Sequence, residues 1–80
     1  KMSNENVSYM EISSYYEKNR QADVVRSVGL NENNYWGVRY WIDGNPLGIE
    51  WYPTKSEVYA EDAAENYIRG IKEYPSNPAL

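Results

Sequence analysis

The chain has 80 residues, enough for one hydrophobic core but not two, and 41% of them are hydrophobic, with three Trp and nine Tyr but no Phe. It contains neither Cys nor His, which excludes disulfides, thiolate metal sites, the commonest general base and the usual catalytic triads. The net charge of -4 disfavours binding to phosphate backbones and favours a protein partner with a basic surface.

The N-terminal third of the chain fits two different structures. Segments 7–12 and 23–28 are rich in β-branched and aromatic residues, which predicts two strands joined by a polar loop over 17–21. The same region holds a capping box at Ser14 and Glu17, which would begin a helix that continues through the second segment. We favour the strands, because β-branched and aromatic residues are poor helix formers and a two-stranded sheet alone has little stability.

A β-hairpin is predicted in the middle of the chain. Segments 35–42 and 47–52 consist mainly of β-formers and flank the turn sequence Asp43-Gly44-Asn45-Pro46. Pairing Ile42 with Leu47 across this turn gathers large apolar side chains on one face, which we expect to be the core. These residues are Trp36, Val38, Tyr40, Ile42, Leu47, Ile49 and Trp51.

The other face of this hairpin is the candidate interaction surface. It carries Tyr35, Arg39, Trp41, Glu50 and Tyr52. Trp, Tyr and Arg dominate the hot spots of protein interfaces, so these residue types favour a protein partner or a second copy of the chain. The register pairs Arg39 with Glu50, and we expect Trp41 to be exposed in the monomer. Aromatic sheets also stack on nucleic-acid bases, but the shortage of basic residues here disfavours that function.

An amphipathic helix is predicted near the C-terminus. Thr54 and Glu57 form a capping box, and the apolar residues after it recur at helical spacing, which predicts a helix over about 54–73. A second capping box at Asp62 and Glu65 allows a start near 62, and the sequence leaves this choice open. Several of the apolar positions are Ala, which lets the helix approach the large aromatic residues of the sheet closely.

Together these elements predict an α+β fold, an antiparallel β-meander of three to four strands packed on one C-terminal amphipathic helix. The alternative is an N-terminal helix, the β-hairpin and the C-terminal helix. We expect a single domain over 7–74, between a disordered tail at 1–6 and a Pro-rich tail at 75–80. Because no apolar run of about 18 residues and no secretory signal occur, we expect a cytoplasmic protein without membrane contact.

No motif in the sequence indicates catalysis or metal binding. Glycine-rich phosphate loops and nucleophile elbows are missing. Glu57, Glu61 and Glu65 share one face of the predicted helix. Since the oxygen ligands of Ca²⁺ or Mg²⁺ usually converge from a loop or from several elements, we interpret this face as solvated. We therefore expect no catalytic residue, no cofactor and no metal ion.

One local similarity to a known family lies in the second half of the chain. The hairpin beginning at Tyr35-Trp36, followed by Tyr59-Ala-Glu-Asp62 and an Ala- and Glu-rich helix, resembles the small proteins of short-tailed phages that inhibit bacterial RNA polymerase. The resemblance implies a phage-encoded inhibitor that occupies a basic surface of a host protein, and it assigns no inhibitory residue. The expected function is a small acidic, non-catalytic protein-interaction module that modulates a host protein. The alternative is a structural homo-oligomer that buries its aromatic sheet face.

Overall fold

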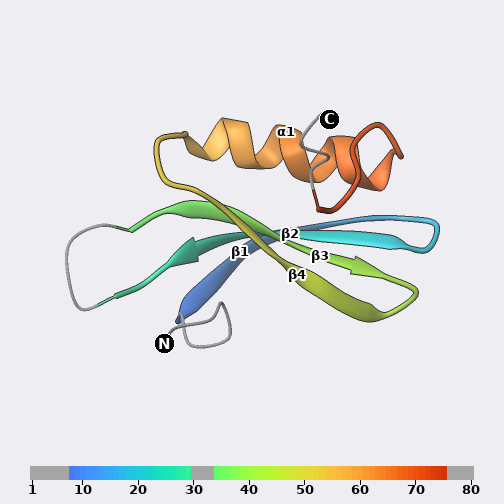
Figure 1. Ribbon diagram of the computed structural model, residues 1–80, viewed down its shortest axis with the longest axis horizontal. Coiled ribbons are helices and arrows are strands. Elements are labelled where there is room, and N and C mark those ends of the chain that lie inside the picture. The colour runs from blue at the N-terminus through green and yellow to red at the C-terminus, as the bar shows by residue number, and fades with distance from the viewer. Residues whose placement is uncertain (1–7, 30–33, 76–80) are drawn as a thin grey trace.

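The computed structural model describes residues 8–29 and 34–75. Its elements are β1 (Tyr9–Glu17), β2 (Arg20–Ser27), β3 (Trp36–Ile42), β4 (Asn45–Tyr52) and α1 (Glu57–Ile68). The strands form one antiparallel meander in the order β1-β2-β3-β4, and α1 lies across one face of it (Figure 1). The predicted α+β fold with a C-terminal helix is confirmed, and the alternative with an N-terminal helix is wrong. The predicted tails lie outside the described residues, apart from Pro75.

The strands of the N-terminal hairpin are longer than the sequence predicted. A turn at Lys18 and Asn19 joins β1 to β2, and the expected polar loop over 17–21 is mostly strand. The register explains this extension, because Glu17 pairs with Arg20 and places opposite charges across the two strands. Polar residues therefore continue the ladder up to the turn.

The β3–β4 hairpin has a different register from the predicted one. Asp43 and Gly44 both have positive φ, 52° and 79°, as a two-residue type I′ turn requires. Ile42 therefore pairs with Asn45, and the predicted pairing of Ile42 with Leu47 is wrong. A bulge at Leu47 follows, since the ladder passes from Trp41–Pro46 to Tyr40–Gly48.

This register inverts the two faces of β4 relative to the prediction. Val38 pairs with Glu50 and Arg39 pairs with Ile49, so neither the Val38–Trp51 pair nor the Arg39–Glu50 pair is formed. Because successive side chains of a strand point to opposite faces, a one-residue shift moves every following side chain to the other side. Glu50 and Tyr52 consequently face α1, whereas Ile49 and Trp51 lie on the opposite face.

The core lies between α1 and the sheet. Three alanines of α1 allow the helix to approach β2 and β3 closely, as predicted, and the Tyr40 and Tyr67 rings pack edge to face with centroids 4.8 Å apart. Of the predicted core residues, Val38 is buried there and Trp36 packs against it, but Ile49 and Trp51 do not belong to it. The buried cluster consists of Ala22, Val24, Val38, Tyr40, Ala60, Ala63, Ala64 and Tyr67.

The helix begins and ends inside the predicted range. Ser56 is the N-cap, with its Oγ accepting a hydrogen bond from the Tyr59 backbone N–H, so both predicted starts, at Thr54 and near 62, are wrong. Thr54 instead belongs to the turn that leaves β4. The helix ends at Ile68 because the chain reverses at Gly70, which has a φ of 80°.

The segment after α1 returns over the sheet and is held by Arg20. The Arg20 guanidinium donates to the carbonyl oxygens of Tyr67 and Lys72, at 2.9 and 3.1 Å, and pairs with the Glu73 carboxylate at 2.9 Å. The predicted helix over about 54–73 would have included Ile71, which lies beyond this reversal and is 71% exposed. No described helix is long and apolar enough to cross a membrane.

Candidate functional site

The sheet face opposite α1 is covered by no other described element (Figure 1). Strand alternation and register place a set of large side chains on this face, which we call the open face. It includes Tyr9, Gln21, Asp23, Val25, Arg39, Trp41, Ile49 and Trp51. Although no second layer of described residues lies over them, Asp23 and Val25 are fully buried. The larger side chains therefore lie flat across the strands and cover their smaller neighbours.

A buried carboxylate fixes the orientation of Trp41. The Trp41 Nε1–H donates to Oδ2 of Asp23 at 2.8 Å, and Gln21 Nε2 donates to Oδ1 at 2.9 Å. Gln21 lies directly opposite Trp41 in the β2–β3 ladder, and Asp23 is the diagonal neighbour of Trp41 on the same face. Because a buried carboxylate without donors is strongly unfavourable, these two hydrogen bonds hold the indole against the sheet.

Arg39 lies between two aromatic side chains of this face. Its guanidinium carbon is 4.7 Å from the Trp41 ring centroid and 5.9 Å from that of Tyr9, and its Nη1 donates to the Tyr9 hydroxyl. Asp23 is opposite Arg39 in the ladder, yet Arg39 forms no ion pair with any residue that the structure describes. Each Asp23 oxygen instead accepts from a neutral donor, and the half-buried guanidinium stays beside the rings.

Trp51 and Tyr9 complete the packing of the open face. Their rings meet edge to face with centroids 6.3 Å apart, which links the edge strands β1 and β4 across the middle of the sheet. The Trp51 ring also lies over Gly37, where an added Cβ would come within 2.6 Å of Trp51 Cε3. Only glycine leaves room for the ring in that position. The Trp51 Nε1 is buried and has no hydrogen-bond acceptor in the described structure.

The five residues of the predicted interaction surface are not all brought together. Arg39 and Trp41 share the open face, whereas Glu50 and Tyr52 face α1, so the predicted Arg39–Glu50 contact is wrong. Trp41 is half-buried rather than exposed. Tyr35 precedes β3, and its backbone N–H donates to Ser27 Oγ at 2.7 Å.

Three residues of the open face, Tyr9, Asp23 and Trp51, are not among the predicted surface residues. Tyr9 and Asp23 follow from strand alternation once the N-terminal strands are accepted, because each lies on the same face as its partner in the ladder. Trp51 lies on the face opposite the predicted one because Asp43-Gly44, a strong signal for a two-residue turn, sets the register of this hairpin.

The opposite face carries a second polar cluster around Glu50. Its Oε1 accepts from the Tyr52 hydroxyl at 2.8 Å and pairs with Lys72 Nζ at 3.0 Å, while the Tyr40 and Tyr52 hydroxyls are 2.7 Å apart. The pKa of the Tyr40 hydroxyl is raised well above its ordinary value, mainly by burial and to a smaller extent by the hydrogen bond with Tyr52. Burial likewise raises the pKa of Tyr52. Both hydroxyls therefore stay protonated and serve as hydrogen-bonding groups.

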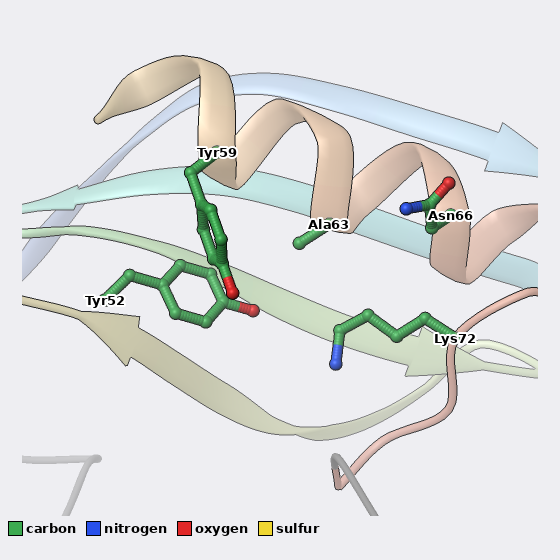
Figure 2. A pocket seen from close by; sticks show the side chains of 5 residues that line it. All are labelled: Tyr52, Tyr59, Ala63, Asn66 and Lys72. Atoms are coloured by element: carbon green, nitrogen blue, oxygen red, sulfur yellow. The ribbon is translucent and has the colours of Figure 1, made fainter. Parts of the chain in front are cut away.

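A pocket of about 200 Å³ opens beside this cluster, between α1 and β4 (Figure 2). It is lined by Tyr52, Tyr59, Ala63, Asn66 and Lys72. The Tyr52 hydroxyl and the Lys72 ammonium are already bound to Glu50, which leaves few polar groups to orient a ligand. The volume is also below the roughly 300 to 1,000 Å³ of ordinary ligand pockets. The open face is consequently the better candidate site.

Neither surface offers a metal site, since no three carboxylates converge within residues 8–29 and 34–75. Comparison with protein-family models, curated proteins and solved structures gives no match to this chain.

Proposed function

We propose that this chain is a small acidic, non-catalytic protein-interaction module that binds its partner through the open face. The observation that carries the proposal is the position of Arg39 between Trp41 and Tyr9, without a charged partner among the described residues. Trp, Tyr and Arg are the residue types that contribute most to interface hot spots. Because Asp23 already fixes Trp41, binding would cost little side-chain entropy at this position.

The arrangement of the carboxylates supports a non-catalytic role. Among the described residues of the strands, Asp23 and Glu50 are the carboxylates that lie within hydrogen-bonded clusters, and they are on opposite faces of the sheet. They cannot act together as a general acid and a general base, because that chemistry needs both groups within reach of one substrate. With His and Cys missing from the sequence, the remaining titratable groups favour binding over catalysis.

The charges that would attract a partner at long range lie on a different side of the molecule from the residues that would contact it. Helix α1 packs on the face of the sheet opposite Arg39, and its acidic residues account for much of the net negative charge. Such a charge would steer the chain toward a basic protein at long range, whereas the open face would supply the direct contacts. Together with the local resemblance to phage inhibitors, this favours a host protein in the bacterial cytoplasm as the partner.

Two arginines of the sheet provide a matched test. Arg39 stacks on Trp41 at 4.7 Å on the open face, and Arg26 stacks on Trp36 at 4.5 Å on the face that packs against α1. Wild type, Arg39→Met and Arg26→Met are immobilised and exposed to bacterial lysate. We expect a protein that is captured by wild type and Arg26→Met but lost by Arg39→Met. Equal capture by both variants would refute binding through the open face.

A second candidate function, a structural homo-oligomer, is favoured by the outer edge of β1, which pairs with no other described strand. Met10, Ile12 and Tyr16 of this strand are 52%, 40% and 67% exposed, and the strand contains no Pro to block pairing. A second copy could extend the sheet by pairing along β1. Light scattering over a wide concentration range distinguishes the two functions, since a monomer at every concentration would exclude the oligomer.

A further inference from the structure

The hydrogen bonds of Arg39 indicate what a partner of the open face must supply. A guanidinium carries more N–H donors than one hydroxyl can accept, and the Tyr9 hydroxyl is the acceptor that the described structure gives it. The other donors of the half-buried side chain are left for water in the free protein. When a partner covers the open face and removes this water, those donors need new acceptors.

The described residues of the open face do not provide these acceptors. Asp23 is the nearest carboxylate in the ladder, but its two oxygens already accept from Trp41 and Gln21 at 2.8 and 2.9 Å. Turning it toward Arg39 would leave the buried indole N–H without an acceptor. Glu11 pairs with Val25 on the same face, but it is exposed and forms no ion pair with Arg39 in the described structure. The acceptors must therefore come from the partner.

Building on the proposed function, we propose that the partner places a carboxylate against Arg39, between the rings of Trp41 and Tyr9. The planar fork of a guanidinium matches a carboxylate in a bidentate pair, which satisfies several N–H donors and neutralises the charge together. The rings on its flanks limit the approach to the edge of the guanidinium and shield the pair from water. The carboxylate is that of an Asp or Glu side chain or of a chain terminus.

Displayed peptide libraries test this proposal without knowledge of the natural partner. Random 12-residue peptides are sorted on the full chain in two formats, one with internal peptides and one with free C-termini. Enriched peptides are synthesised, and their Kd values are measured for wild type, Arg39→Met, Arg26→Met and Trp41→Phe. Comparing the formats distinguishes a side-chain carboxylate from a terminal one. The carboxylate is neutralised in the peptide, by replacing Asp with Asn or Glu with Gln or by amidating the C-terminus, so the protein itself stays unchanged.

We expect peptides whose Kd rises at least about ten-fold with Arg39→Met but not with Arg26→Met, and by the same factor when their carboxylate is neutralised. The two changes together should cost no more than either alone, as a direct pair requires. Peptides that respond to Trp41→Phe and not to carboxylate neutralisation would overturn this inference and leave the proposed function standing. If sorting yields no peptide that responds to Trp41→Phe or Arg39→Met, both proposals fail.

Discussion

Trp41→Phe tests the buried hydrogen bond on which the open face depends. The substitution keeps an aromatic ring beside Arg39 but removes the Nε1–H that donates to Asp23 at 2.8 Å. Asp23 is fully buried, so its carboxylate would keep only the donor of Gln21. Losing a hydrogen bond to a charged group costs about 1.5 to 3 kcal/mol. That is a large part of the roughly 4 to 12 kcal/mol expected for a domain of this length.

Urea unfolding and thermal melting measure this loss, and a cost of about 2 kcal/mol corresponds to a decrease in Tm of about 8 to 16 °C. Trp51→Phe is the matched control on the same face, because its Nε1 is buried without an acceptor. Removing an unsatisfied donor offsets the loss of ring volume, so Trp51→Phe should stay within about 1 kcal/mol of wild type. Equal losses in the two variants would show that ring size, and not the Asp23 hydrogen bond, determines stability.

Two further predictions concern the face that packs against α1. Arg20→Met removes donors to two carbonyls and to Glu73, so it should lower the free energy of unfolding by about 2 to 3 kcal/mol and speed amide hydrogen exchange in the segment after α1. The control Arg69→Met breaks an exposed ion pair and should lower it by less than about 0.5 kcal/mol. Equal losses in the two variants would contradict the role of Arg20. The pKa of Tyr40 is raised in the folded protein, so Tyr40 keeps its proton at a pH where the unfolded chain loses it. Its contribution to the free energy of unfolding is complete below about pH 10 and should fall by about 1.4 kcal/mol for each pH unit above that. Melting curves between about pH 9 and 11 should show a shallower decline for Tyr40→Phe, and an unchanged slope would refute the assignment.

Local sequence signals were sufficient to predict the order of the elements. The β-formers near Val24 and Val38 predict strands, and the spacing of Ala60, Ala63 and Ala64 predicts the buried face of the helix, since each pattern reflects burial of one face. The exact start of α1 was not predicted, because three residues in this region have capping side chains. Ser56 is the N-cap because Thr54 is held in the turn after β4.

The composition of the candidate site was predicted only in part, because it depends on contacts between strands that are distant in the sequence. Arg39 and Trp41 were assigned to one face from alternation along a single strand, which needs no register. Their neighbours Tyr9 and Trp51 come from the two edge strands, and their placement depends on every register between them. The observed register of the β3–β4 hairpin differs from the predicted one by one residue. This difference places Trp51, and not Tyr52, on the open face.

The bulge at Leu47 allows a direct test of this register. Since Leu47 is the extra residue between the Trp41–Pro46 and Tyr40–Gly48 pairs, its deletion leaves a regular ladder in which every later side chain keeps its face. We expect the deletion variant to fold, with stability lowered by about 1 to 2 kcal/mol through changed strand twist. Deleting Ile49 is the control. It either moves Glu50 and all later residues of β4 to the opposite face or closes the bulge and puts Gly48 in the place of the buried Ile49, and it should unfold the domain.

Circular dichroism and the dispersion of amide NMR signals measure both outcomes. If Ile42 instead paired with Leu47, as the sequence first indicated, deleting Leu47 would shorten the turn and remove that cross-strand partner. Val38 and Tyr40 would then lose the facing residues of β4, and the deletion of Leu47 would be as damaging as that of Ile49. A folded Leu47 deletion beside an unfolded Ile49 deletion therefore supports the two-residue turn, and the reverse order would refute it, together with the assignment of Trp51 to the open face.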